Sequence, residues 1–410
     1  MNKRLRRAAA TVPLLLVTVA CQAGGTDGAA GPAATPSSTV KPVFEQRLDD
    51  QLSAATQATR ASGSARFTST VTYGSAKGTA VERTTGVLDY TKGTARVERS
   101  FDVPRRFPQD AAFAFGREPG AEGRETYRVE GSTIDYRTGG GTWLRYSASA
   151  SMEFAEKIED FLTHAGDAAP WGRTLAEVVT HADPEKNPSP TDGGGRRYQV
   201  TVEGREAADA LPPELAEAFT NDMSAEVALT VDVDKGGRLL RAESDYTPIL
   251  EPLHRAGVLK GVTTLRVAYD LTGHGGQSVP AAEGGEKTED AEKALTPLDA
   301  VKPGACGSLD TGLGGPDLVR AVPCGEKADV RVFGQVRVSE KSVTGDPWQF
   351  AEGRADEGCR TEMDAAPDAW TAGSVPRDTF VAWSGNTTAH SEDGAAPTVT
   401  GDYACYVELR

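Results

Sequence analysis

The sequence predicts an α+β protein, with a long twisted antiparallel sheet and packed helices, followed by a small α+β domain that contains disulfides. Three observations support this fold class. Runs of alternating apolar and polar residues recur from residue 65 to residue 271, a helical pattern precedes them, and every cysteine after Cys21 lies beyond residue 300. The 410 residues therefore divide into two chemically different parts.

A helix is expected at the start of the first domain, which we place at residues 43–272. Phe44, Leu48, Leu52 and Ala55 recur at nearly four-residue spacing, which gives a helix one apolar face. The other helical patterns lie at 154–162, at 175–182 and after Pro212.

Strands are expected where apolar side chains recur at every second position. Phe67, Val71 and Tyr73 alternate with Thr68 and Thr72, for example, which gives one apolar face. Similar runs lie at 79–90, 94–101, 125–130, 132–137, 142–147, 227–233, 238–245 and 262–271, and strand character also resumes near residue 198. Turn residues separate most of these runs, so the sequence predicts an antiparallel meander with inserted helices.

The N-terminus has the features of an export signal. Four basic residues within the first seven precede an apolar run at 8–20, which is too short to span a bilayer. Cys21 directly after Thr18-Val19-Ala20 resembles a bacterial lipobox, and this resemblance implies that the cysteine becomes diacylated and starts the mature chain. We therefore expect a signal peptide at 1–20, a flexible tether at 21–42 and a protein held by lipid on the extracytoplasmic face of the cell membrane. The alternative is a secreted protein without lipid.

Charge and motifs exclude several classes of function. A formal net charge of -15 argues against nucleic-acid binding. No nucleophile elbow or phosphate-binding loop is found, and we expect neither an enzyme nor a cofactor. The five histidines lie far apart, at His164, His181, His254, His274 and His390, so no metal site is expected.

One calcium-loop pattern is interpreted as a turn. Asp232, Asp234 and Glu243 match part of such a loop, but position Gly236 lacks the required oxygen ligand. The flanking segments alternate as strands rather than helices, so the residues between them are expected to form a hairpin turn.

The four remaining cysteines are Cys306, Cys324, Cys359 and Cys405. An even number of cysteines in an exported chain indicates disulfides, and three pairings are open. We favour Cys306–Cys324 and Cys359–Cys405. No two of the cysteines have the close spacing that zinc sites use.

The first domain resembles the LppX/LprG group of actinobacterial lipoproteins, which have a LolA-like half-barrel. The similarity rests on the lipobox, the opening helix, the strand order and the phrases Ile134–Tyr136, Trp143–Tyr146 and Val231–Leu239. It implies an apolar cavity that holds the acyl chains of a lipid or glycolipid. The candidate lining residues are Phe67, Val71, Tyr90, Trp143, Leu229, Val231 and Tyr269. The alternative is that these side chains fill a closed core.

An acidic linker rich in Gly and Ala is expected at 273–296, before a second domain at 297–410. Phrases around Cys306 and Val322-Pro323-Cys324 resemble the septum-formation-related domain of actinobacteria, although Lys327 and Ala328 depart from that family's pattern. The leading hypothesis is a surface lipoprotein that carries lipid and contacts another envelope component. The alternative is a non-catalytic interaction or structural protein associated with cell division or wall organisation.

Overall fold

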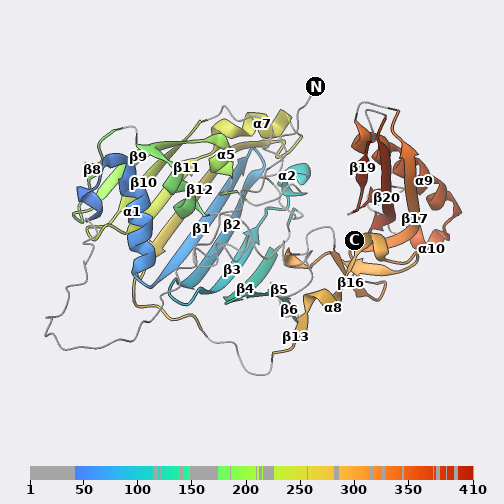
Figure 1. Ribbon diagram of the computed structural model, residues 1–410, viewed down its shortest axis with the longest axis horizontal. Coiled ribbons are helices and arrows are strands. Elements are labelled where there is room, and N and C mark those ends of the chain that lie inside the picture. The colour runs from blue at the N-terminus through green and yellow to red at the C-terminus, as the bar shows by residue number, and fades with distance from the viewer. Residues whose placement is uncertain are drawn as a thin grey trace, which may run out of the picture. The chain divides into compact units, whose positions relative to one another are not determined.

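Two sheets organise the described part of this computed structural model (Figure 1). It describes residues 42–113, 119–120, 122–138, 142–147, 174–184, 186–208, 210–211, 215, 226–255, 257–280, 286–313, 318–325, 328–343, 346–372, 374, 379–384, 386–391 and 396–409. The expected signal peptide, Cys21, almost all of the tether, the helical pattern at 154–162 and most of the pattern after Pro212 lie outside these residues. No helix within them is long and apolar enough to cross a membrane.

The first sheet follows the chain order closely. Its strands are β1 (Ser64–Ser75), β2 (Gly78–Asp89), β3 (Thr94–Asp102), β4 (Glu122–Glu130), β5 (Thr133–Thr138), β6 (Trp143–Ser147), β7 (Asp183–Pro184), β8 (Ser189–Pro190), β9 (Arg196–Glu203), β10 (Glu226–Val233), β11 (Leu239–Asp245), β12 (Val262–Thr272) and β13 (Thr288–Asp290). The spatial order is β13-β6-β5-β4-β3-β2-β1-β12-β11-β10-β9-β7, with β8 beside β9. The two ends of this order do not pair among the described residues, so the sheet is open.

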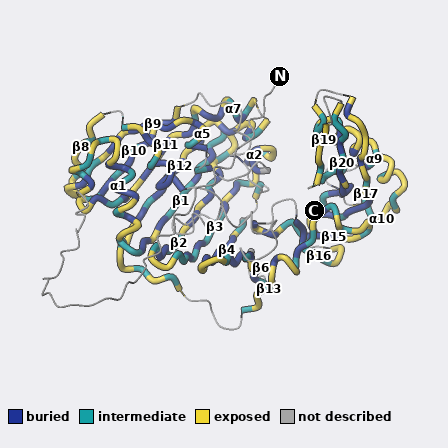
Figure 2. Tube along the Cα trace, in the orientation of Figure 1, coloured by how far each residue is buried: buried dark blue, intermediate teal, exposed yellow. Residues whose placement is uncertain are grey.

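The predicted alternation agrees with the observed strands. Along β12 the buried positions alternate with exposed or partly exposed ones over most of the strand, and Figure 2 shows the same alternation of colours along the sheet. One sheet face packs into a core while the other meets water, which is the usual arrangement of an antiparallel sheet. The α+β class and the long antiparallel sheet are therefore confirmed.

Short helices accompany this sheet. They are η1 (Val43–Glu45), α1 (Leu48–Ala61), α2 (Gln109–Phe113), α4 (Leu175–Val178), η2 (Val179–His181), α5 (Gly204–Ala208), η4 (Thr247–Ile249) and α7 (Leu250–Arg255). Helix α1 buries Leu52 and Ala55, as its apolar spacing predicts. Thr174 and Glu177 form a capping box at the start of α4.

The second half of the expected linker forms regular structure. Residues Thr288–Asp290 form β13, which pairs in parallel with β6, and α8 (Ala291–Ala294) follows. Ala291 and Leu295 are buried in the same core as the first sheet. Composition alone did not predict this because the backbone hydrogen bonds to β6 do not depend on side-chain polarity.

The second sheet holds the C-terminal part of the chain. Its strands are β14 (Leu295–Pro297), β15 (Cys306–Ser308), β16 (Leu318–Val322), β17 (Val330–Lys341), β18 (Val381–Trp383), β19 (Thr388–His390) and β20 (Thr398–Glu408), and its helices are η5 (Leu298–Ala300), α9 (Pro347–Ala365) and α10 (Asp368–Thr371). Strands β17 and β20 pair along most of their length, and α9 packs on both.

Two glycines allow α9 to approach the sheet closely. A Cβ atom at Gly358 of α9 would lie 2.6 Å from Val336, and one at Gly334 of β17 would lie 2.5 Å from Glu362. The disulfide Cys359–Cys405 joins this helix to β20, with the two Cα atoms 5.4 Å apart. The helix and the strands therefore form two packed layers that the disulfide cross-links.

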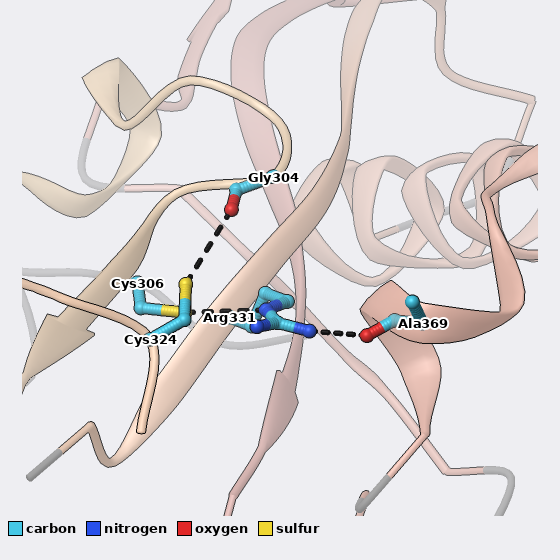
Figure 3. Close-up of a disulfide and its surroundings, with 5 residues drawn as sticks. All are labelled: Gly304, Cys306, Cys324, Arg331 and Ala369. Atoms are coloured by element: carbon cyan, nitrogen blue, oxygen red, sulfur yellow. Dashed lines mark hydrogen bonds between the residues drawn. A yellow bond between two sulfur atoms is a disulfide. The ribbon is translucent and has the colours of Figure 1, made fainter.

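The second disulfide, Cys306–Cys324, joins β15 to the residues just after β16 (Figure 3). Arg331 of β17 donates from Nε to Cys306 Sγ at 3.2 Å and from a terminal nitrogen to the Ala369 carbonyl. The guanidinium thereby connects the disulfide to α10. The structure contains the two pairings that the sequence favours.

The predicted hairpin turn between β10 and β11 is formed by local hydrogen bonds. The amide groups of Gly236 and Arg238 both donate to Asp234 Oδ1, each at 2.8 Å. Although burial opposes ionisation of Asp234, the Arg238 backbone and side-chain hydrogen bonds lower the pKa of this carboxyl. Asp234 therefore stabilises the turn, in agreement with the interpretation of the sequence.

We expect Gly237→Ala to destabilise the protein. Gly237 has φ +81°, and an added Cβ would lie 2.6 Å from a Val43 methyl group. Left-handed strain and overpacking together predict a loss of about 1–3 kcal/mol in the free energy of unfolding, measured by urea denaturation. Gly193→Ala is the control, because no neighbouring atom lies within 4 Å of its added Cβ. Equal effects of the two substitutions would contradict this account.

Candidate functional site

Five of the seven candidate lining residues project from the same face of the first sheet, here called the inward face. Residues directly opposite one another in paired strands point to the same side. Val71 of β1 is opposite Val267 of β12. Tyr269 lies two residues further along β12, on the same face, and is opposite Ala242 of β11. Ala242 is in turn opposite Val231 of β10. The candidates on this face are Phe67, Val71, Leu229, Val231 and Tyr269.

Trp143 lies on the opposite face and does not join this set. In β6, Leu144 is opposite Tyr136 and Tyr146 is opposite Ile134, so these residues point inward while Trp143 points outward. Adjacent apolar residues at 143 and 144 leave the face undetermined from the sequence, because a shift of one residue exchanges the two faces.

Tyr90 lies just beyond the end of β2, at the rim of the inward face. Its amide donates to the Gly63 carbonyl at 2.9 Å, and its side chain packs partly buried against the core. Burial raises the pKa of Tyr90, and it also raises the pKa of Tyr269. Both phenols therefore stay neutral at physiological pH.

Helix α1 covers the inward face over β9 to β11 (Figure 1). Tyr198 of β9 donates from its hydroxyl to Gln51 Oε1 at 2.7 Å, and the Leu239 amide donates to Thr59 Oγ1 at 2.8 Å. Leu229 and Val231, on the neighbouring strand, are almost completely buried. This part of the inward face is a packed core.

The inward face is less tightly covered at β1 and β2. Ser69 lies in the inward row between the buried Phe67 and Val71, yet it remains partly exposed, and so does Gly86 on β2. Phe67 stacks on Tyr269 with ring centroids 5.7 Å apart. A Cβ at Gly86 would lie 2.3 Å from the Phe67 ring, so only glycine leaves space for the ring in this position. Ser69 and Gly86 are therefore inward positions that the core does not cover completely.

A buried ionic cluster interrupts the apolar inward face on β2 to β4. Arg99 Nε lies 2.6 Å from Glu82 Oε1, and an Arg99 terminal nitrogen lies 3.5 Å from Glu125 Oε2. Tyr127 donates to the same Glu125 oxygen at 3.2 Å. All four side chains are more than nine-tenths buried, so charge and apolar surface occur together here.

Sequence reasoning did not identify this cluster, although one signal was present. Arg99 has the same strand parity as Val97 and Phe101, which are both buried. A charged residue inside an apolar row requires a partner, because an isolated charge is costly to bury. Which carboxylates supply the partners depends on the pairing of β2, β3 and β4, which the sequence does not state.

We expect Arg99→Met to destabilise the protein strongly. The substitution removes the guanidinium that both buried carboxylates contact, and such a loss costs about 3–5 kcal/mol of unfolding free energy. Urea denaturation measures the change. Arg241→Met is the control, because Arg241 pairs with Glu243 at an exposed position where about 1 kcal/mol or less is expected. Similar losses in both variants would contradict the special role of the buried cluster.

A second charged cluster surrounds Trp143 on the outward face. The guanidinium carbon of Arg128 lies 3.5 Å from the Trp143 ring centroid, and that of Arg137 lies 4.3 Å from it. Glu286 binds Arg128 at 3.0 Å and Arg137 at 2.8 Å. Cation–π contacts and ion pairs thus hold the segment before β13 against β4 and β5.

We expect the effect of Glu286→Gln on stability to depend on pH. Burial opposes ionisation, but Trp143 and the two arginines lower the pKa of Glu286 below its ordinary 4.5. A lowered carboxyl pKa contributes stability above pH 4.5 and loses it as pH falls through the folded-state value. The stability difference between native chain and variant should therefore shrink below pH 4.5, as thermal unfolding at several pH values would show.

The control for this experiment is Glu251→Gln on α7, where the glutamate is exposed. A constant difference between the native chain and Glu286→Gln across the acidic range would contradict the proposed ion-pair origin.

Within the described residues, no group of three or more His, Cys, Asp or Glu side chains is arranged to hold a metal ion. Cys21, the expected lipidation site, lies outside those residues. The structure thus defines an α+β protein with an open antiparallel sheet, an inward face that is mostly apolar and an outward face that is mostly polar.

Comparison with solved structures found distant similarities. The lipoprotein LppX of Mycobacterium tuberculosis is 12% identical, covers 57% of this chain and 98% of its own, and gives a TM-score of 0.28. The Pseudomonas aeruginosa MucA/MucB complex structure is 11% identical, with coverage of 87% and 92% and a TM-score of 0.23. A putative outer membrane lipoprotein-sorting protein domain from Vibrio parahaemolyticus is 9% identical, with coverage of 54% and 89% and a TM-score of 0.20.

No protein-family description matches the sequence, and no curated protein matches it. The similarities to solved structures are weak, with TM-scores of 0.28 or lower.

Proposed function

We propose that this chain is a cell-envelope lipoprotein that binds the acyl part of a lipid or glycolipid on the inward face of its first sheet. The observation that supports the proposal is the partly exposed Ser69 between the buried apolar residues Phe67 and Val71. Burying hydrocarbon against such a surface contributes about 25 cal/mol per Å². Export and lipidation at Cys21 remain the expectation from the sequence, and they would keep the protein at the extracytoplasmic side of the membrane.

The location of this site on β1 and β2 is more specific than the sequence hypothesis. Leu229 and Val231 belong to the core under α1, and Trp143 belongs to the outward cluster. Phe67, Val71 and Tyr269 remain as candidate contacts, with Tyr90 at the rim.

The second domain, from residue 297, is proposed to contact another envelope component. Its two disulfides and its helix-covered sheet make it a rigid module suited to an exported protein. No catalytic role is proposed for either part of the chain.

Native mass spectrometry of the purified full-length chain, followed by lipid extraction, tests the proposal. We expect co-purifying acyl species that bind again after delipidation. Ser69→Phe would fill the space beside Phe67 and lower lipid uptake about tenfold, the equivalent of about 1.4 kcal/mol. Thr72→Phe adds the same ring to the outward face of β1 and should leave uptake unchanged.

Two outcomes would overturn the proposal. A clean protein mass with no lipid uptake would favour the interaction or structural protein. Equal uptake by Ser69→Phe and the native chain would exclude the inward face at β1, provided that both variants show native circular dichroism.

A further inference from the structure

A pocket of about 520 Å³ lies on the outward face of the first sheet, opposite the proposed lipid site. We call it the arginine pocket. The charged residues that line it are Arg66 of β1, Arg96 and Glu98 of β3, Arg124 of β4 and Arg137 of β5. Threonines of β1, β2 and β4 line it as well, so the pocket offers both positive charge and hydroxyl groups.

The strand register explains how the arginines come together. Arg66 is opposite Val87, Val87 is opposite Arg96, and Arg96 is opposite Arg128, so these positions form one row across four strands. The neighbouring row contains Glu98 and Thr126. Adjacent strands lie about 4.8 Å apart, which places Arg66 and Arg96 about 10 Å apart at their bases, within reach of a common ligand.

The positive charge of the pocket is only partly neutralised. Four arginines and one glutamate line it, in a chain whose formal net charge is -15. No hydrogen bond or ion pair of Arg96 is found within the described residues, and Arg66 donates to the neutral amide oxygen of Gln277. Arg124 reaches Glu98 at 3.4 Å with an exposed side chain, and Arg137 shares Glu286 with Arg128.

The neighbouring Arg128 lies within electrostatic range of two arginines of the pocket. Burial lowers the pKa of Arg128, and repulsion from Arg96 and Arg137 lowers it further, against the opposing effect of Glu286 and Asp135. Arg96 and Arg137, which line the pocket, are therefore close enough to repel Arg128, which does not line it. An anion bound in the pocket would offset the positive charge of Arg96 and Arg137.

We propose that the arginine pocket binds a phosphate group. Guanidinium groups recognise phosphate through paired hydrogen bonds, and a tetrahedral anion with several oxygens accepts from more than one arginine at once. A single carboxylate would satisfy fewer of the four arginines, because it offers two oxygens in one plane. The threonine hydroxyls supply further donors. The phosphate could belong to a soluble ester or to a lipid headgroup, since the chemistry that recognises both is the same.

Isothermal titration calorimetry of the full-length chain with inorganic pyrophosphate tests the soluble source. Sedimentation with phosphatidylcholine vesicles, with and without phosphatidylglycerol, tests the headgroup source. Arg96→Gln removes the Arg96 guanidinium and should weaken binding of the responding probe about tenfold, which corresponds to about 1.4 kcal/mol. Binding should also fall with added salt.

Arg83→Gln is the matched control. Arg83 is an exposed arginine of β2 that points to the outward face, as Arg96 does, but it does not line the pocket. Its loss should therefore change the affinity less than about twofold. A loss of affinity in Arg96→Gln alone, with either probe, supports a specific phosphate site. The probe that responds identifies the source of the phosphate. Equal loss in both variants would show attraction by diffuse charge alone, and absence of binding with both probes would also overturn the proposal. Circular dichroism of each variant verifies folding.

These outcomes are independent of the proposed lipid function. Ser69→Phe acts on the inward face and Arg96→Gln on the outward face, and the two residues belong to different strands. Failure of one experiment therefore leaves the other interpretable.

Discussion

The antiparallel pairing of β1 with β12 is the constraint on which the rest of the structure depends. Phe67 lies opposite Leu271 and Val71 opposite Val267, so strands about 200 residues apart in the sequence form the centre of the first sheet. Their register decides which side chains face inward. A shift by one residue would bring Thr68 and Thr72 to the core and expose the apolar row, which the burial of that row opposes.

From that centre the sheet extends in two directions with different chemistry. Towards β9 the inward positions are apolar and α1 covers them, so this half behaves as an ordinary core. Towards β4 the inward row contains Glu82, Arg99 and Glu125, whose mutual contacts offset the cost of burying charge. The proposed lipid site lies where these two regions meet, beside Ser69.

The two faces of the sheet also differ in the ligand that is proposed for each. Apolar side chains and few charges mark the inward face, whereas arginines and threonines mark the outward face of β1 to β5. Strand alternation makes this separation possible, because neighbouring residues in one strand serve opposite faces. Ala65 and Arg66 are the clearest example, one in the core and the other in the arginine pocket.

The sequence by itself determined the α+β class, most strand positions, the opening helix and the hairpin turn at Lys235-Gly236-Gly237. Each depends on local periodicity or on turn residues such as Asp234 and Gly237. Which of Trp143 and Leu144 points inward, which carboxylates meet Arg99, and that Arg66 and Arg96 share one pocket were decided only by the tertiary structure. The physical reason is that these features depend on the register between strands, and a single strand does not specify its register.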